Sequence, residues 1–149
     1  MELPPRNFLR RHPLLRDALI WAIPAIVFGS VLRLLLLSYS PYAYWGSDSN
    51  SYFSFAEQFL SSGKISLYDK RRYVYPIFLL PVTVLPGAML SWLAWIQHGL
   101  GILTLIPLAY CVRKTFVHWR WLVIPVTVFY AGIPMILWYE HELLAETIL

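Results

Sequence analysis

Several ionisable residues in this chain lie where long apolar stretches begin or end. The first of these that could take part in a reaction is Asp48. It follows the first apolar stretch, within Ser47-Asp48-Ser49. A carboxylate in such a place can accept a proton from an attacking hydroxyl or amine, which is general-base chemistry. It can equally cap a helix or lie in water. The position therefore makes Asp48 a catalytic candidate and leaves the structural alternative open.

A basic cluster further along the chain has the right residue types to bind phosphate. Lys70, Arg71 and Arg72 precede Tyr73-Val74-Tyr75-Pro76. Guanidinium groups bind phosphate through paired hydrogen bonds, and cations stabilise the charge that develops on a phosphate leaving group. The alternative is that these side chains reach along apolar surface towards lipid headgroups. The sequence therefore predicts a phosphate site here, with headgroup contact as the second interpretation.

Ionisable and polar residues also lie inside or beside the apolar stretches themselves. A charged group that enters a bilayer is costly and tends to face a cavity or a partner. For Arg33, snorkelling towards the headgroups is the alternative. Polar residues within a span, here Gln97 and His98, are more typical of hydrogen bonds between spans than of catalysis. The substrate-binding candidates of this group are Arg33, His141, Glu142 and Glu146.

Other classes of site are not expected. The chain has one cysteine, Cys111, which cannot form an internal disulfide, and no cluster of aspartates that would predict a metal ion. We therefore expect no metal and no cofactor. The net charge of +4 is small, and the aromatic residues lie within apolar runs, so a nucleic-acid partner is not expected either.

The composition predicts a membrane protein, whose helices would position these groups. Hydrophobic residues make up 58% of the 149 residues and charged residues 13%, whereas soluble domains have about 45–50% and about 25%. About 20 apolar residues suffice to cross the hydrocarbon core as a helix. A cleaved signal peptide would have a shorter apolar core than the first stretch. The expected fold is an all-α polytopic transmembrane bundle, with spans at about 18–38, 91–112 and 121–139 and a fourth beginning near Leu143.

The distribution of basic residues predicts the orientation. Short cytoplasmic loops carry an excess of Lys and Arg. Four arginines precede the first span, and Arg113, Lys114 and Arg120 lie in the short loop before the third. We therefore expect a multi-pass protein of the plasma (inner) membrane with a cytoplasmic N-terminus. Residues 39–90 and 140–146 then lie outside.

The long outer loop should contain interfacial helices. In the segment 51–62, Tyr52, Phe55, Phe59 and Leu60 recur at helical spacing, while Ser54, Gln58 and Ser61 occupy the other face. An amphipathic helix of this kind lies in the membrane plane. Residues 76–88 are interrupted by prolines, and we expect a short helix at or re-entering the interface.

The order of these features along the chain resembles a known family. A span with Arg33 is followed by Asp48, the amphipathic segment Phe55 to Gly63, Tyr68, Arg71-Arg72, Tyr75-Pro76, and a span with Gln97. Pro134 and Tyr139-Glu140-His141-Glu142-Leu143-Leu144-Ala145-Glu146-Thr147 follow. This succession is similar to the N-terminal part of GT-C superfamily membrane glycosyltransferases, in the branch with bacterial relatives of protein O-mannosyltransferases and aminoarabinose transferases.

The resemblance implies a hexosyl or pentosyl transfer from a polyprenyl-phosphate carrier to an acceptor glycan, lipid or protein at the outer face. Asp48 matches the family's acidic residue after the first span and is expected to be the general base. Family members have many more spans, so the resemblance implies that this chain, 1–149, is an incomplete enzyme. The alternative is a non-catalytic small membrane subunit or a module that binds the lipid carrier.

Overall fold

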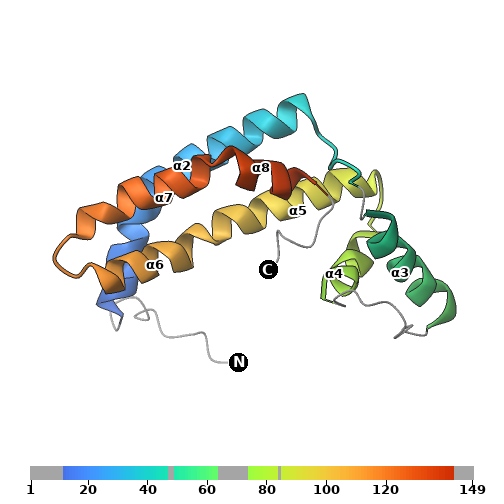
Figure 1. The fold of residues 1–149 in the computed structure, drawn as a ribbon, viewed down its shortest axis with the longest axis horizontal. Coiled ribbons are helices and arrows are strands. Elements are labelled where there is room, and N and C mark those ends of the chain that lie inside the picture. Colours follow the sequence, from blue (N-terminus) through green and yellow to red (C-terminus); the bar gives the residue numbers. More distant parts are fainter. Residues whose placement is uncertain (1–11, 47–48, 64–73, 84, 143–149) are drawn as a thin grey trace.

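The computed structural model describes residues 12–46, 49–63, 74–83 and 85–142. These residues are mostly helical, and Figure 1 shows long helices lying side by side with a shorter pair to one side. The elements are α2 (Pro13–Tyr39), α3 (Ser49–Ser62), α4 (Val74–Thr83), α5 (Met89–Leu103), α6 (Leu105–Thr115), the 3₁₀ turn η1 (Arg120–Leu122), α7 (Val123–Gly132) and α8 (Pro134–His141).

The first helix, α2, packs through its small residues and turns its large apolar residues outward. Its buried positions are Ala18, Ala22, Ala25, Gly29, Arg33 and Leu37, which follow one another at intervals of three or four and so form one stripe. Large side chains such as Ile23, Val27 and Val31 are at least half exposed. Small residues at the contact and apolar residues on the outside are typical of helices that associate within lipid. The stripe lets α6 and α7 approach α2 closely.

The next long helical segment is broken once. α5 and α6 together cover Met89–Thr115, with a turn at Thr104 between them. Pro107 has no N–H and its ring clashes with the carbonyl four residues earlier, so the regular hydrogen-bond ladder cannot continue through this point. The Thr104 hydroxyl donates to the Gly101 carbonyl at 2.7 Å. The break is therefore local, and the segment still reads as one candidate span.

The third long segment is bent more sharply. η1 and α7 run to Gly132, and α8 starts at Pro134, with an angle of 50° between the two parts. Ile133 has an extended backbone (φ −63°, ψ 117°), as a residue before proline prefers. The third span expected over 121–139 therefore stays a prediction: these residues are helical but bent, as in a broken span or a re-entrant loop.

The stretch 40–46, which follows α2, is held at the end of the bundle where α2 stops, which we call the Tyr39 end. Ala43 N–H donates to the Leu90 carbonyl at 3.0 Å and Tyr44 N–H to the His141 carbonyl at 2.7 Å. Helices α3 and α4 pack against each other, and α4 also contacts α5. Tyr52 is buried in a core with Leu79 and Leu93.

The helix expected over 51–62 is present as α3, with Ser54, Gln58 and Ser61 exposed as predicted. Tyr52 is buried and Phe59 is half-buried, whereas the Leu60 side chain is 51% exposed. The Phe55 side chain lies outside the described set. The short helix expected over 76–88 is α4, which ends earlier, at Thr83.

Within the described ranges, two helical segments are long and apolar enough to cross a membrane, Pro13–Tyr39 and Met89–Thr115. The bent pair would be a third if its two parts form one span. The predicted fourth span, from Leu143 on, lies outside the described residues.

Candidate functional site

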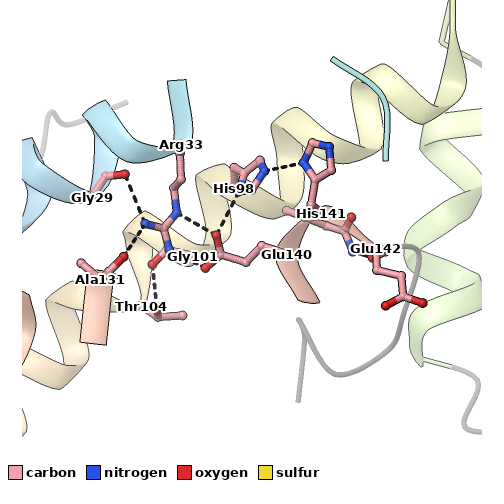
Figure 2. A network of polar contacts seen from close by, with 10 residues as sticks. Gly29, Arg33, His98, Gly101, Thr104, Ala131, Glu140, His141 and Glu142 are labelled. Atoms are coloured by element: carbon pink, nitrogen blue, oxygen red, sulfur yellow. Dashed lines mark hydrogen bonds and ion pairs between the residues drawn. The ribbon is translucent and has the colours of Figure 1, made fainter. Parts of the chain in front are cut away.

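The strongest polar feature of the bundle is built around Arg33, four residues after Gly29 on the stripe of α2. The side chain is 2% exposed, so it is enclosed by protein and does not extend along the outside of the bundle. Its Nε donates to Glu140 Oε2 at 2.7 Å and its Nη2 to Glu140 Oε1 at 2.5 Å. Figure 2 shows this two-pronged contact between α2 and α8. The snorkelling interpretation of Arg33 is therefore wrong, and the residue faces a partner within the bundle.

The bend at Pro134 supplies Arg33 with a further acceptor. Because α7 stops at Gly132, the Ala131 carbonyl has no N–H of a following helical turn to accept from. The Arg33 Nη1 donates to this carbonyl at 3.3 Å and to the Gly29 carbonyl at 3.2 Å. A cation at the C-terminal end of a helix also interacts favourably with the helix dipole. Arg33 thus connects α2, α7 and α8.

Two histidines extend the pair in a row. His98 Nδ1 lies 3.0 Å from Glu140 Oε2, and His98 Nε2 lies 2.9 Å from His141 Nδ1. His98, Glu140 and His141 are 2%, 3% and 0% exposed. Figure 2 shows the row running from Arg33 through Glu140 and His98 to His141. Four ionisable side chains from three helices therefore form one buried network.

Beside this row of side chains, at the Tyr39 end, Gln97 and Glu142 make further contacts between helices. Gln97 Nε2 donates to the Glu142 carbonyl at 3.1 Å. Gln97 and His98, both on α5, therefore form hydrogen bonds to the end of α8, and the expected bonding between helices is confirmed. The Glu142 carboxylate, by contrast, is half-buried and accepts from Trp138 Nε1 at 3.1 Å. Tyr44 packs edge-on against the His141 ring, with centroids 4.8 Å apart.

Two glycines make room for the two carboxylates. A Cβ atom on Gly101 of α5 would overlap the Glu140 carboxylate, and a Cβ on Gly46 would overlap that of Glu142. Neither overlap could be relieved without moving the carboxylate. Gly101 is therefore part of the site, since it allows Glu140 to lie against the α5 backbone.

The charges of the network balance. Both Glu140 oxygens accept from Arg33, which is the arrangement of an ionised carboxylate with a guanidinium. Removing two charges from water is costly, and close geometry with several hydrogen bonds is what offsets that cost. With neutral histidines the network carries one positive and one negative charge. It can therefore exist inside the bundle, while either charge alone would be strongly unfavourable.

The predicted site residues divide into two groups. Arg33 and His141 belong to the buried network, and the backbone carbonyl of Glu142 accepts from Gln97 beside it. The remaining candidates lie outside the described residues: Asp48, Lys70, Arg71, Arg72 and Glu146. That these groups meet in one cavity therefore stays a prediction.

Sequence reasoning missed Glu140 as the partner of Arg33 and missed Gly101 altogether. The signal for the first was available, because an arginine within a span predicts a carboxylate on another span. A glycine inside a helix is a weaker signal, since its reason appears only when the neighbouring helix is in place.

In the part of the chain that the structure describes, no group of three histidine, cysteine or acidic residues is arranged to hold a metal ion. What this arrangement can do is to hold the spans in one register and to move a proton along the two histidines. Comparison of the chain with family models, with curated proteins and with solved structures finds no match.

Proposed function

We propose that this chain forms the N-terminal membrane part of a glycosyltransferase that moves a sugar from a polyprenyl-phosphate carrier to an acceptor hydroxyl or amine at the outer membrane face. One observation carries the proposal: the ionisable residues of three helices meet in one buried network beside the segment that leads to Asp48. Tyr44 of that segment donates to the His141 carbonyl, and Gly46, two residues before Asp48, lies against the Glu142 carboxylate.

The network supports the proposal through the rigidity it gives. General-base catalysis needs a carboxylate held close to the acceptor nucleophile, and such a group is positioned best when its supporting residues are fixed by hydrogen bonds. On the far side of Asp48, Ser49 is buried, its N–H donates to the Gly46 carbonyl at 3.2 Å, and its hydroxyl accepts from Gly46 N–H at 2.8 Å. Gly46 and Ser49, on either side of Ser47-Asp48, are therefore hydrogen-bonded to each other, and Tyr44 just before them is bonded to α8.

In this proposal Asp48 removes the proton of the acceptor, and Arg71 and Arg72, with Lys70, stabilise the leaving phosphate. The lipid tail of the carrier remains in the bilayer, along the apolar outward faces of the helices. Enzyme activity would require the spans that relatives of the resembled family carry in addition.

The test is a transfer assay with the full gene product in membranes, using a radiolabelled polyprenyl-phosphate sugar. Asp48→Asn keeps the shape of the side chain but accepts no proton, so transfer should fall by at least about 100-fold while expression and membrane insertion stay unchanged. Asn50→Asp restores a carboxylate two residues away and should not rescue transfer. Wild-type turnover in Asp48→Asn would remove Asp48 from the mechanism.

A second candidate function has its own support. The Arg33–Glu140 pair is fully satisfied by protein groups, as in a structural clamp between helices. A non-catalytic subunit or a carrier-binding module would need no more than this clamp. Absence of transfer in the wild-type gene product, together with retained binding of the polyprenyl phosphate that is lost in Arg72→Lys, would favour the carrier-binding module.

A further inference from the structure

The end of the bundle opposite the Tyr39 end carries an excess of positive charge. α2 begins there beside the end of α6, as Figure 1 shows, and we call it the Pro13 end. Among the described residues, the acidic side chain at this end is that of Asp17. Its carboxylate accepts from Arg113 Nε at 2.5 Å and is thereby neutralised. The basic side chains that stay exposed at this end are Arg16, Lys114 and Arg120.

Lys114 differs from the two arginines on either side of it in having no partner in the described part of the chain. Arg113 is bound to Asp17, and its Nη1 donates to the Val117 carbonyl at 2.8 Å. Arg120 lies over the Trp21 ring, 5.6 Å from the ring centroid. The exposed Lys114 ammonium makes no hydrogen bond or ion pair with a described residue. It is therefore a compact positive charge that remains available to an anion.

A largely apolar cavity lies along the same face of α6 as Lys114. Its volume is about 520 Å³, which is within the usual range of ligand pockets. The described residues that line it are His12, Pro13, Leu14 and Leu15 at the start of α2, and Ile106, Pro107 and Tyr110 of α6. Because Leu14 and Pro107 are exposed, the cavity can be reached from outside the bundle. Tyr110 and Lys114 are four residues apart, so their Cβ atoms are about 5–6 Å apart on one face of the helix.

The charge and the cavity are arranged as the parts of a phospholipid are. α6 runs towards the Pro13 end, so Lys114 lies where the helix ends and Ile106 lies eight residues earlier. At 1.5 Å per residue, this separation is about 12 Å along the helix, in the direction of the bilayer centre. A headgroup beside Lys114 therefore directs its acyl chain past Tyr110 towards Ile106. Basic pockets between membrane helices bind anionic headgroups in this manner.

We propose that Lys114 and this cavity form a binding site for an anionic phospholipid, such as phosphatidylglycerol, from the leaflet at the Pro13 end. The Lys114 ammonium binds the phosphodiester, and one acyl chain occupies the cavity between α6 and the start of α2. A zwitterionic lipid binds less well, because its headgroup carries a cation that Lys114 repels. The site lies at the end of the bundle away from the segment that leads to Asp48, so it does not rest on the proposed function.

The test compares phosphatidylglycerol with phosphatidylcholine of the same chain length, titrated into the purified whole chain in detergent micelles. Native mass spectrometry gives the dissociation constant of each lipid. Phosphatidylglycerol should bind about fivefold more tightly, the factor expected for one basic residue near a membrane surface. Lys114→Gln should make the two dissociation constants equal, whereas Lys114→Arg should keep the difference between them.

The matched control is Arg120→Gln, which removes the same charge at the same end from the side chain over Trp21. It should keep the preference for phosphatidylglycerol. Equal losses in Lys114→Gln and Arg120→Gln would mean that a positive surface attracts anionic lipid in general, and would overturn the site. So would an unchanged preference in Lys114→Gln.

A second pair of variants tests the cavity without changing any charge. Ile106→Trp fills the space of the acyl chain and should lower the occupancy of phosphatidylglycerol to the level found in Lys114→Gln. Leu103→Trp adds the same indole at a position that is 57% exposed and does not line the cavity, and binding should stay as in the wild type. Wild-type binding by Ile106→Trp, with an unchanged circular dichroism spectrum, would overturn the role of the cavity. The Lys114 variants decide the proposal even if Ile106→Trp does not fold.

Discussion

The buried pair of Arg33 and Glu140 should behave as one energetic unit, which a double-mutant cycle can measure. The two charges are joined by contacts of 2.7 and 2.5 Å, and their side chains are 2% and 4% exposed. Unit charges about 4 Å apart attract by about 4 kcal/mol at an effective dielectric constant of about 20. Removing one partner of a buried pair costs about 3–5 kcal/mol, because the other is left uncompensated.

We therefore expect Arg33→Met and Glu140→Gln each to lower the free energy of unfolding by about 3–5 kcal/mol. The double variant removes both charges, and the amide oxygen that replaces the carboxylate can still accept from His98. It loses the Arg33 bond to the Ala131 carbonyl, worth about 1 kcal/mol. The double variant should thus lie only about 1 kcal/mol below the wild type, closer to it than either single variant.

The assay is reversible unfolding in mixed micelles by increasing the SDS fraction, followed by circular dichroism. The matched control is the pair at the other end of the bundle, in which Arg113 Nε donates to Asp17 Oδ2 at 2.5 Å with side chains 12% and 27% exposed. Its coupling energy should be at most about 1 kcal/mol because water screens it. Additive effects of Arg33→Met and Glu140→Gln would refute the argument that neither charge is tolerated alone.

Two further predictions follow from the packing and from the distribution of charge. Gly101→Ala should lower the unfolding free energy by about 1–3 kcal/mol, since its Cβ would overlap Glu140; Gly99→Ala, on the same helix with open space around it, should be neutral or stabilising by up to about 1 kcal/mol, and equal effects would contradict the role of Gly101. In a background without Cys111, a membrane-impermeant thiol reagent added from outside should label a cysteine at position 50 but not one at position 115. The reverse labelling pattern would show that the topology is inverted and that the proposed site lies on the other side of the membrane.

Local patterns in the sequence predicted the helices well. The helical spacing of Tyr52, Phe59 and their neighbours predicted α3 within two residues of its observed start, and the first apolar stretch predicted α2. These signals are local because a helix is closed by hydrogen bonds over four residues. Pro107 and Pro134 were also visible, but a proline near the middle of an apolar run does not show by itself how far a helix bends.

The assembly of the site could not be predicted from such local patterns. Arg33 and Glu140 are 107 residues apart, and no periodic pattern connects positions on separate helices. His98 was correctly expected to hydrogen-bond between helices, but its particular partners depend on the register of α5 against α8. The small-residue stripe from Ala18 to Gly29 is a regular signal that would have identified the packed face of α2, and with it the inward direction of Arg33.

The separation of Arg33 from its counter-ion has a consequence for how the protein is made. A ribosome adds about 5–20 residues per second, so the 107 residues between the two partners take roughly 5 to 20 s to synthesise. During that interval the first span must enter the membrane with an unneutralised arginine, which at the centre of a bilayer costs about 2.5–3.5 kcal/mol on insertion scales. Large apolar side chains on the exposed face of α2, such as Ile23, Val27 and Val31, favour insertion and offset this cost. The ion pair can therefore form only late in synthesis, once α8 has been made and packs against α2.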